Sequence, residues 1–519
     1  MISANKKRVK NSLLILLILI IIVLVLLVLF YSGYIDILKN AISGNKSEKD
    51  IIDSILINNI KLNYDSVSNT YYLPISLDGD KEVYLDINII SNYNINSKIK
   101  DEEFNKDVQF SDIINYETTY QLDVETCLYK KSYYIKFTNL PSISLSFNED
   151  RISREYIYSE FSIVDPDYQI NNTQYEYLDN AKVRLRGASS ISYSKKSYRI
   201  KLERDVDFGM LGMNKSKVWI LDSLATDPSN LRVKIASDIW NKINEDLSEE
   251  KYEDLNTKFV EVYINNEYKG LYLLKEVINE DLLNLDDTGV LIKGTNWNKV
   301  DFDNYDTVES EIFGPFEMKY PDNPKKYTEA WKVILNKLKG YYDSELSYEA
   351  LIENFYIENV ANYKIFLLII QGLDNYEYRN MYFSIANNDK DAKALITPWD
   401  LDLTFGILWD DEKKAAIKDY YSVDKIVEPF GIHGDDRTVE YYKDRWNFLI
   451  ENILNKEEIN KIIDYQYEYL SKANSLSREN IRNSNLELKK NVNQEEEIIK
   501  LKEWYEKRID VINDYIESL

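Results

Sequence analysis

Acidic and amide side chains occur on both sides of a predicted β-hairpin in the C-terminal half of the chain, formed by strands 381–385 and 394–397. Those before and after the hairpin are Asp374, Asn375, Asn380, Asp400 and Asp402. Residues that precede and follow a hairpin lie at the same end of it, so we expect the two groups to face each other. In a strand-like segment Asp400 and Asp402 would also point the same way, since side chains alternate.

Converging carboxylate and amide oxygens suit a hard divalent cation, Mg²⁺ or Mn²⁺, bound together with phosphate oxygens. The competing interpretation is that these side chains cap turns, as Asp and Asn often do. The chain has one histidine, His433, and one cysteine, Cys127. Unless His433 serves, this excludes a Ser-His-Asp triad and a His-ligated zinc, and the single cysteine excludes an intramolecular disulfide. Catalysis would depend on carboxylates, Lys, Arg, Asn or Tyr.

A second group of candidates comes from predicted strands nearer the N-terminus. Strands 181–186 and 196–202 flank a loop of small residues, 187–194, whose backbone N–H groups could approach a phosphate. The charge would come from Arg184, Arg186, Lys195 and Lys196. The simpler interpretation is an ordinary hairpin with basic residues on its solvent face.

The order of the predicted elements indicates an α+β fold. A hairpin spans 259–276, turns at Asn265–Asn266 and ends on Lys275–Glu276, and strand 289–294 carries Lys293. Beyond Gly314, helical spacing covers 327–338, 350–371 and 494–516. A strand-rich lobe is therefore followed by a helical lobe.

Three blocks of sequence resemble the signature of the spore coat protein H (CotH) kinase family. They are Arg186-Gly-Ala-Ser-Ser190 with Lys195-Lys-Ser-Tyr-Arg-Ile-Lys201, the hairpin Tyr263–Glu276, and Asp374…Asn380-Met-Tyr-Phe with Pro398-Trp-Asp-Leu-Asp-Leu-Thr-Phe-Gly406. They occur in the family's order, and the resemblance covers about residues 140–517. The chain departs from the family pattern at Arg379, where His is common, and at Asn266, where Gly is usual.

The resemblance implies an atypical protein-kinase-like fold that binds ATP with a divalent metal and phosphorylates serine in a protein substrate, at the cell surface or spore coat. Asp374 would then be the catalytic Asp and Asp400 the metal-binding Asp, with Asp402 beside it. Asn375 and Asn380 compete for the second metal position. The candidates for holding the nucleotide are Arg186, Lys196, Glu276 and Lys293. We expect Glu276 to form an ion pair with one of the basic residues.

Two other classes of function stay open. Asp400-Leu-Asp402 is also a DxD motif, which many metal-dependent glycosyltransferases use to hold a nucleotide sugar. Alternatively, the protein is catalytically inactive and uses the fold for binding at the cell surface, where ATP is scarce.

The N-terminal region predicts a single membrane anchor. Residues 13–30 are an unbroken apolar run, long enough for about 27 Å of helix, and the basic residues lie before it. We expect a cytoplasmic N-terminus (1–12), an uncleaved anchor (13–31), a linker (32–55), a β-rich module (56–138) and a kinase-like domain (139–519), with the bulk of the chain on the extracytoplasmic side. A cleaved signal peptide is the alternative. The net charge of −24 argues against nucleic acid as a partner.

Overall fold

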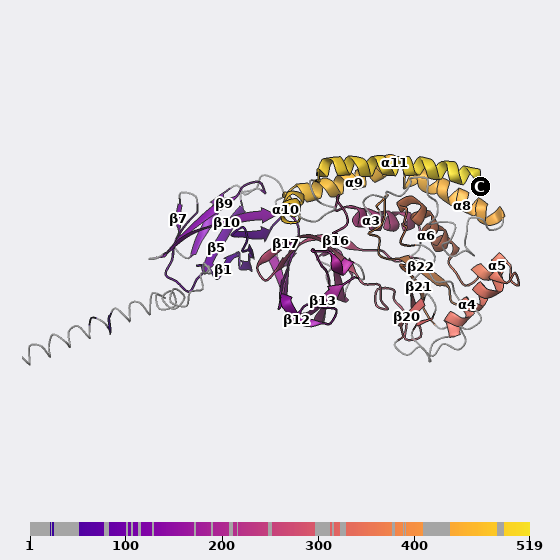
Figure 1. Ribbon diagram of the computed structural model, residues 1–519, viewed down its shortest axis with the longest axis horizontal. Coiled ribbons are helices and arrows are strands. Elements are labelled where there is room, and N and C mark those ends of the chain that lie inside the picture. Colours follow the sequence, from indigo (N-terminus) through magenta and orange to yellow (C-terminus); the bar gives the residue numbers. More distant parts are fainter. Residues whose placement is uncertain are drawn as a thin grey trace, which may run out of the picture. The chain divides into compact units, whose positions relative to one another are not determined.

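The structure is a computed structural model of the 519-residue chain (Figure 1). The residues that it describes are Ile21, Val23, Leu24, 51–76, 83–99, 102–104, 107–112, 116–126, 129–170, 173–187, 190–206, 211–214, 216–247, 252–295, 312–313, 316–321, 329–375, 379–387, 389, 391–407, 436–484 and 492–519. The chain divides into two compact units. The first comprises Met1–Thr138 with Gln174–Glu176, and the second comprises Asn139–Thr173 with Tyr177–Leu519.

The first unit is built from strands. They form a four-stranded sheet in the order β2-β1-β5-β8 and a six-stranded sheet in the order β3-β4-β10-β9-β6-β7. Their bounds are β1 Ser54–Ile57, β2 Ile60–Lys61, β3 Asn63–Asp65, β4 Thr70–Pro74, β5 Val83–Ile90, β6 Asn96–Ile99, β7 Glu102–Phe104, β8 Asp107–Asp112, β9 Tyr120–Glu125 and β10 Lys130–Thr138. Tyrosine rings fill much of the interior, with Tyr64 stacked on Tyr71 at 4.5 Å between centroids.

A closed β-barrel begins the second unit. Seven strands are hydrogen-bonded in the order β11-β12-β13-β14-β15-β17-β16. Their bounds are β11 Ser142–Ser146, β12 Ile157–Ile170, β13 Thr173–Arg186, β14 Ser197–Val206, β15 Ser216–Asp222, β16 Thr257–Ile264 and β17 Glu267–Glu276. Short 3₁₀ turns lie at Glu149–Arg151 and Ser190–Ser192. Apolar residues at alternate positions of the strands are buried inside the barrel, which is therefore a packed core.

The hairpin of β16 and β17 turns where the sequence predicts. Asn265 and Asn266 both have positive φ, 51° and 59°. This is the left-handed pair that a two-residue hairpin turn requires, and Asn tolerates it better than most residues. The replacement of the usual glycine by Asn266 is thus compatible with the turn.

A five-stranded antiparallel sheet and a layer of helices complete the second unit (Figure 1). The sheet has the order β19-β20-β18-β21-β22, with β18 Val290–Gly294, β19 Ile312–Phe313, β20 Phe316–Tyr320, β21 Met381–Ile385 and β22 Ala394–Pro398. The helices are α3 Arg232–Asn244, α4 Glu329–Tyr342, α5 Tyr348–Ile352, α6 Ile357–Ile370, α8 Asp436–Asn452, α9 Lys456–Ser471, α10 Ser475–Arg482 and α11 Gln494–Ser518.

Helix α6 is the centre of the helical part. Its residues from Asn359 to Ile370 are all buried, and it contacts α3, α8, α11 and β22. The helix ends because Gln371 adopts the left-handed conformation, with φ 51°. The helix predicted over 350–371 is in fact two helices, α5 and α6, because the backbone between them turns at 353–356.

The predicted α+β order is confirmed, with a strand-rich part followed by a helical part. Within the residues that the structure describes, no helix is long and apolar enough to cross a membrane. The anchor predicted at 13–31 lies outside the described residues, apart from Ile21, Val23 and Leu24, which are helical.

Candidate active site

The two acidic and amide groups predicted from the sequence meet at one end of the hairpin of β21 and β22. Met381 pairs with Pro398, and the Trp399 N–H donates to the Asn380 carbonyl at 2.9 Å. The buried Asn375 side chain bridges both segments, because its amide donates to the carbonyls of Asn380 (2.9 Å) and Trp399 (2.7 Å). The hairpin therefore fixes the loop after α6 against the segment that carries Asp400.

Asp374 is buried and held from two sides. Arg379 Nε lies 3.1 Å from its Oδ1, and Asn380 Nδ2 donates to its Oδ2 at 2.8 Å. Burial raises the pKa of Asp374 to about 6, with Arg379 opposing the rise and Asp400 adding to it. A positioned carboxylate with a pKa near neutral can accept a proton from a hydroxyl.

Asp400 is ionised and paired with Arg186, a residue distant in the sequence. Arg186 Nη2 lies 2.7 Å from Asp400 Oδ1. Burial opposes the charge of Asp400, but Arg186 and Lys275 outweigh it and lower its pKa to about 2. The Asp400 side chain keeps 34% of its exposure, so the carboxylate is accessible to a ligand.

Asp400 and Asp402 do not lie on a strand, contrary to the expectation. Strand β22 ends at Pro398, and Asp400 has a left-handed φ of 58°. The segment turns, so alternation does not set the directions of the two side chains. The two carboxyl groups still interact. Burial raises the pKa of Asp402, and the nearby charges of Asp400 and Asp222 raise it further.

Three cations surround Trp399. The Arg186 guanidinium carbon lies 5.5 Å from the ring centroid, Lys275 Nζ 5.3 Å and Lys293 Nζ 6.0 Å. Asp222 links two of them, since its Oδ2 is 3.1 Å from Lys275 Nζ and 3.8 Å from Arg186 Nη1. A largely buried aromatic ring thus anchors a concentration of positive charge next to Asp400.

Two members of this cluster, Asp222 and Lys275, were not among the residues selected from the sequence. Asp222 ends strand β15 after an apolar run, and Lys275 comes one residue before the end of β17. Alternation along these strands places both on the outer face of the barrel, where Arg186 also lies. The sequence pattern that could have identified them is a charged residue at the end of a largely apolar strand.

The structure does not bring two of the predicted phosphate ligands into the cluster. Lys196 Nζ donates to backbone carbonyls of its own loop, those of Ile191 (2.6 Å) and Tyr193. Glu276 follows Lys275 and therefore points to the opposite face of β17, where it accepts from the backbone N–H of Asn214. Among the described residues Glu276 forms no ion pair, and burial raises its pKa to about 6.

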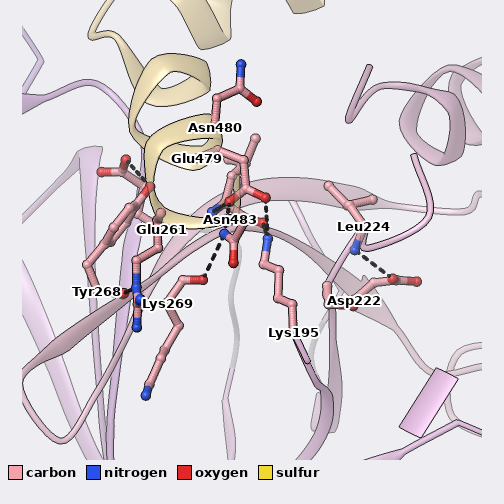
Figure 2. A network of polar contacts seen from close by, with 12 residues as sticks. Lys195, Asp222, Leu224, Glu261, Tyr268, Lys269, Glu479, Asn480 and Asn483 are labelled. Carbon is pink, nitrogen blue, oxygen red and sulfur yellow. Dashed lines mark hydrogen bonds and ion pairs between the residues drawn. The ribbon is translucent and has the colours of Figure 1, made fainter. Parts of the chain in front are cut away.

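Lys195, the other lysine of this pair, ties the barrel to helix α10 (Figure 2). Its ammonium lies 2.8 Å from Glu479 Oε1 and donates to the Leu271 carbonyl at 2.6 Å. Glu479 Oε2 accepts from the Leu271 N–H (2.8 Å) and from Asn483 Nδ2 (3.0 Å). Gly270 makes this approach possible, because a Cβ there would lie 2.2 Å from Glu479 Oε2. This network holds β17 at Leu271, four residues before Lys275.

The donor atoms at the hairpin end are of the type that a hard divalent cation prefers. Within the described residues, Asn375 Oδ1 is buried and has no hydrogen-bond partner, and Asp402 lies close enough to Asp400 for burial and the charge of Asp400 to raise its pKa. In that part of the chain, no three His, Cys, Asp or Glu side chains are grouped closely enough to hold a metal by themselves. Protein donors would therefore supply only part of a coordination shell, as is usual for Mg²⁺ bound with phosphate and water.

Comparison with known proteins identifies a family. The family model described as CotH kinase protein matches residues 183–512, which is more than half of the chain. No curated protein matches the sequence. The matched region contains Arg186, Asp222, Lys275, Asp374 and Asp400.

Proposed function

Because the chain belongs to the CotH kinase protein family, we propose that it is an atypical kinase that transfers the γ-phosphate of ATP to serine in a protein substrate. The observation that carries this proposal is the meeting of Asp374 and Asp400 at one end of a hairpin, with Arg186, Lys275 and Lys293 gathered beside Asp400. Phosphoryl transfer depends mainly on positioning and charge neutralisation, and this arrangement offers both. The family resemblance extends the proposal to a kinase-like fold.

Each residue has a distinct role in the proposed reaction. Asp374, held by Arg379 and Asn380, orients the serine hydroxyl and accepts its proton. The basic residues around Trp399 bind the phosphates and neutralise charge that develops during transfer. A bound Mg²⁺ or Mn²⁺ would further neutralise the phosphates, with Asp400, Asp402 and Asn375 or Asn380 as its protein donors.

The test is transfer of labelled phosphate from ATP to the protein itself or to a serine-rich acceptor. Asp374→Asn should keep ATP binding and lose roughly 10²-fold or more in transfer, because the proton acceptor is gone. Asp400→Asn should also weaken metal-dependent ATP binding. Asp343→Asn, a change of an exposed carboxylate in the turn after α4, is the matched control. If the two site variants transfer phosphate at the unmodified rate, the assignment is wrong.

The same assay separates the other two classes. A catalytically inactive binding protein would show no transfer under any metal condition. A DxD glycosyltransferase would bind a nucleotide sugar in preference to ATP.

We also propose that residues 13–31 anchor the protein in the membrane, with the N-terminus in the cytoplasm and the catalytic region outside. The basis is the apolar run with the basic residues before it. Protease added to intact cells should digest the body of the protein. Protection until lysis would refute this topology.

A further inference from the structure

Five basic side chains share the outer face of barrel strands β13 and β14. The inner face is marked by Val183 and Ile200, a cross-strand pair in the barrel core with no exposed surface. Residues that alternate with these two must therefore point outward. The outward basic residues, called the basic track here, are Lys182, Arg184, Arg186, Arg199 and Lys201.

Like charges face each other across the two strands. Lys182 pairs with Lys201, and Arg184 pairs with Arg199, in successive positions of the same face. Like charges placed directly opposite each other in a sheet are destabilising. In a chain with a net charge of −24, two such pairs in succession indicate a surface arranged for an anionic ligand.

The described part of the chain does not neutralise this surface. Lys182, Arg199 and Lys201 form no ion pair with any residue that the structure describes. Two acidic residues lie on the same face, Glu160 on β12 and Glu203 on β14. Among the described residues, neither forms an ion pair with the basic track. Among the described residues, the charges of the exposed Lys182 and Lys201 are therefore available to a partner, whereas Arg199 is half-buried and its Nε is buried.

Two exposed tyrosines border the basic track. Lys182 Nζ lies 5.4 Å from the ring centroid of Tyr158, and the Arg184 guanidinium lies 5.2 Å from that of Tyr156. Tyr158 keeps 72% of its exposure and Tyr156 keeps 37%. Aromatic rings with cations over them offer a partner both apolar contact and charge.

The basic track leads away from the candidate active site. Arg186, at one end, is bound to Asp400. Outward residues on one strand repeat every ~6.6 Å, so Arg184 and Lys182 follow Arg186 at about that spacing. An extended polypeptide has the same repeat for side chains on one of its sides, so alternate side chains of such a segment could each meet one cation.

We infer that the basic track binds the acceptor polypeptide, and that the acceptor is an acidic segment with carboxylates at alternate positions on one side of its serine. The segment lies extended along β13 and β14, with the serine at the Arg186 end. This inference rests on the proposed kinase function for the identity of the ligand as an acceptor.

The experiment measures binding and transfer separately on the full chain. A fluorescent peptide with one serine and a glutamate at every second position after it is titrated with the protein in the absence of ATP. The comparison peptide carries glutamine in place of every glutamate. The acidic peptide should bind roughly tenfold more tightly, and the difference should shrink between about 50 and 300 mM salt, because exposed charges are screened.

Charge reversal locates the surface. The double variant Lys182→Glu with Lys201→Glu should weaken acidic-peptide binding at least roughly fivefold while leaving ATP binding unchanged, since neither residue belongs to the site. The control double variant, Lys500→Glu with Lys507→Glu, makes the same charge change on the exposed side of α11 and should leave peptide binding within about twofold.

The outcomes distinguish this inference from the proposed function. Tight binding of the acidic peptide, without transfer of phosphate to it, to the protein itself or to a serine-rich acceptor, supports the surface and refutes the kinase assignment. Equal transfer to both peptides, or unchanged binding by the Lys182/Lys201 variant, overturns the inference and leaves the kinase assignment standing. If that variant loses binding to vesicles of phosphatidylglycerol but keeps binding to the peptide, the surface is a membrane contact and the inference is wrong.

Discussion

Replacement of Lys195 by methionine should destabilise the second unit strongly. The lysine and its partner Glu479 keep only 2% and 0% of their side-chain exposure, and their charged atoms lie 2.8 Å apart (Figure 2). Methionine fills a similar volume but removes the positive charge and the hydrogen bond to the Leu271 carbonyl. Glu479 then stays buried without a counter-charge, which costs about 3–5 kcal/mol.

The adjacent lysine provides a matched control. Lys196 is half-buried, and its partners among the described residues are two carbonyls of its own loop, so Lys196→Met leaves no buried charge behind in that part of the chain. Its expected loss is about 1 kcal/mol. The two variants differ by one position and carry the same substitution, so the difference isolates the buried ion pair.

Urea unfolding followed by tryptophan fluorescence is the suitable assay. All eight tryptophans lie between Trp219 and Trp504, within the second unit, so the signal does not depend on the first. The double variant Lys195→Met with Glu479→Gln should recover a large part of the loss, because no unpaired charge then remains. If Lys195→Met costs no more than Lys196→Met, or the double variant recovers nothing, the buried pair is not a significant source of stability.

Three further predictions concern the same unit. Gly270→Ala should lower the free energy of unfolding in urea by more than the backbone strain of about 1–3 kcal/mol, because φ is +112° and the new Cβ also meets a carboxylate of α10. Gly212→Ala, with φ +65° and no atom within 4 Å of the new Cβ, should cost only the backbone strain. Transfer of phosphate should fall as the pH is lowered through about 6, because Asp374 becomes protonated; an unchanged rate at pH 5 would refute its role as proton acceptor. Asp222→Asn should lower the urea midpoint by the equivalent of about 3 kcal/mol, since it leaves a buried lysine without its carboxylate, and a midpoint like that of the unmodified protein would contradict this pairing.

Local sequence patterns determined the element order and the meeting of the two acidic groups. Strand alternation and helical spacing are properties of short segments, so they reveal strands before helices without any knowledge of the fold. The hairpin of β21 and β22 has a short connection, and its geometry alone requires Asn380 and Trp399 to be neighbours. The three blocks of the family signature are likewise visible in the sequence, and the match over residues 183–512 confirms the resemblance.

Only the tertiary structure decided which charged residues act together. Asp222 and Lys275 join Arg186 because β15 pairs with β17 and only β14 separates β15 from β13, a long-range arrangement that no local pattern encodes. Alternation along β17 separates Lys275 from Glu276, since consecutive strand residues face opposite sides.

Helix α10 also determines the different environments of Lys195 and Lys196. Glu479 lies 284 residues from Lys195, and it reaches the barrel only because Gly270 leaves room for it. The lysine that meets this carboxylate is buried in a structural ion pair, while its neighbour is satisfied by its own loop. The sequence shows two equivalent cations, and their difference arises from the desolvation and pairing that distant elements impose on one of them.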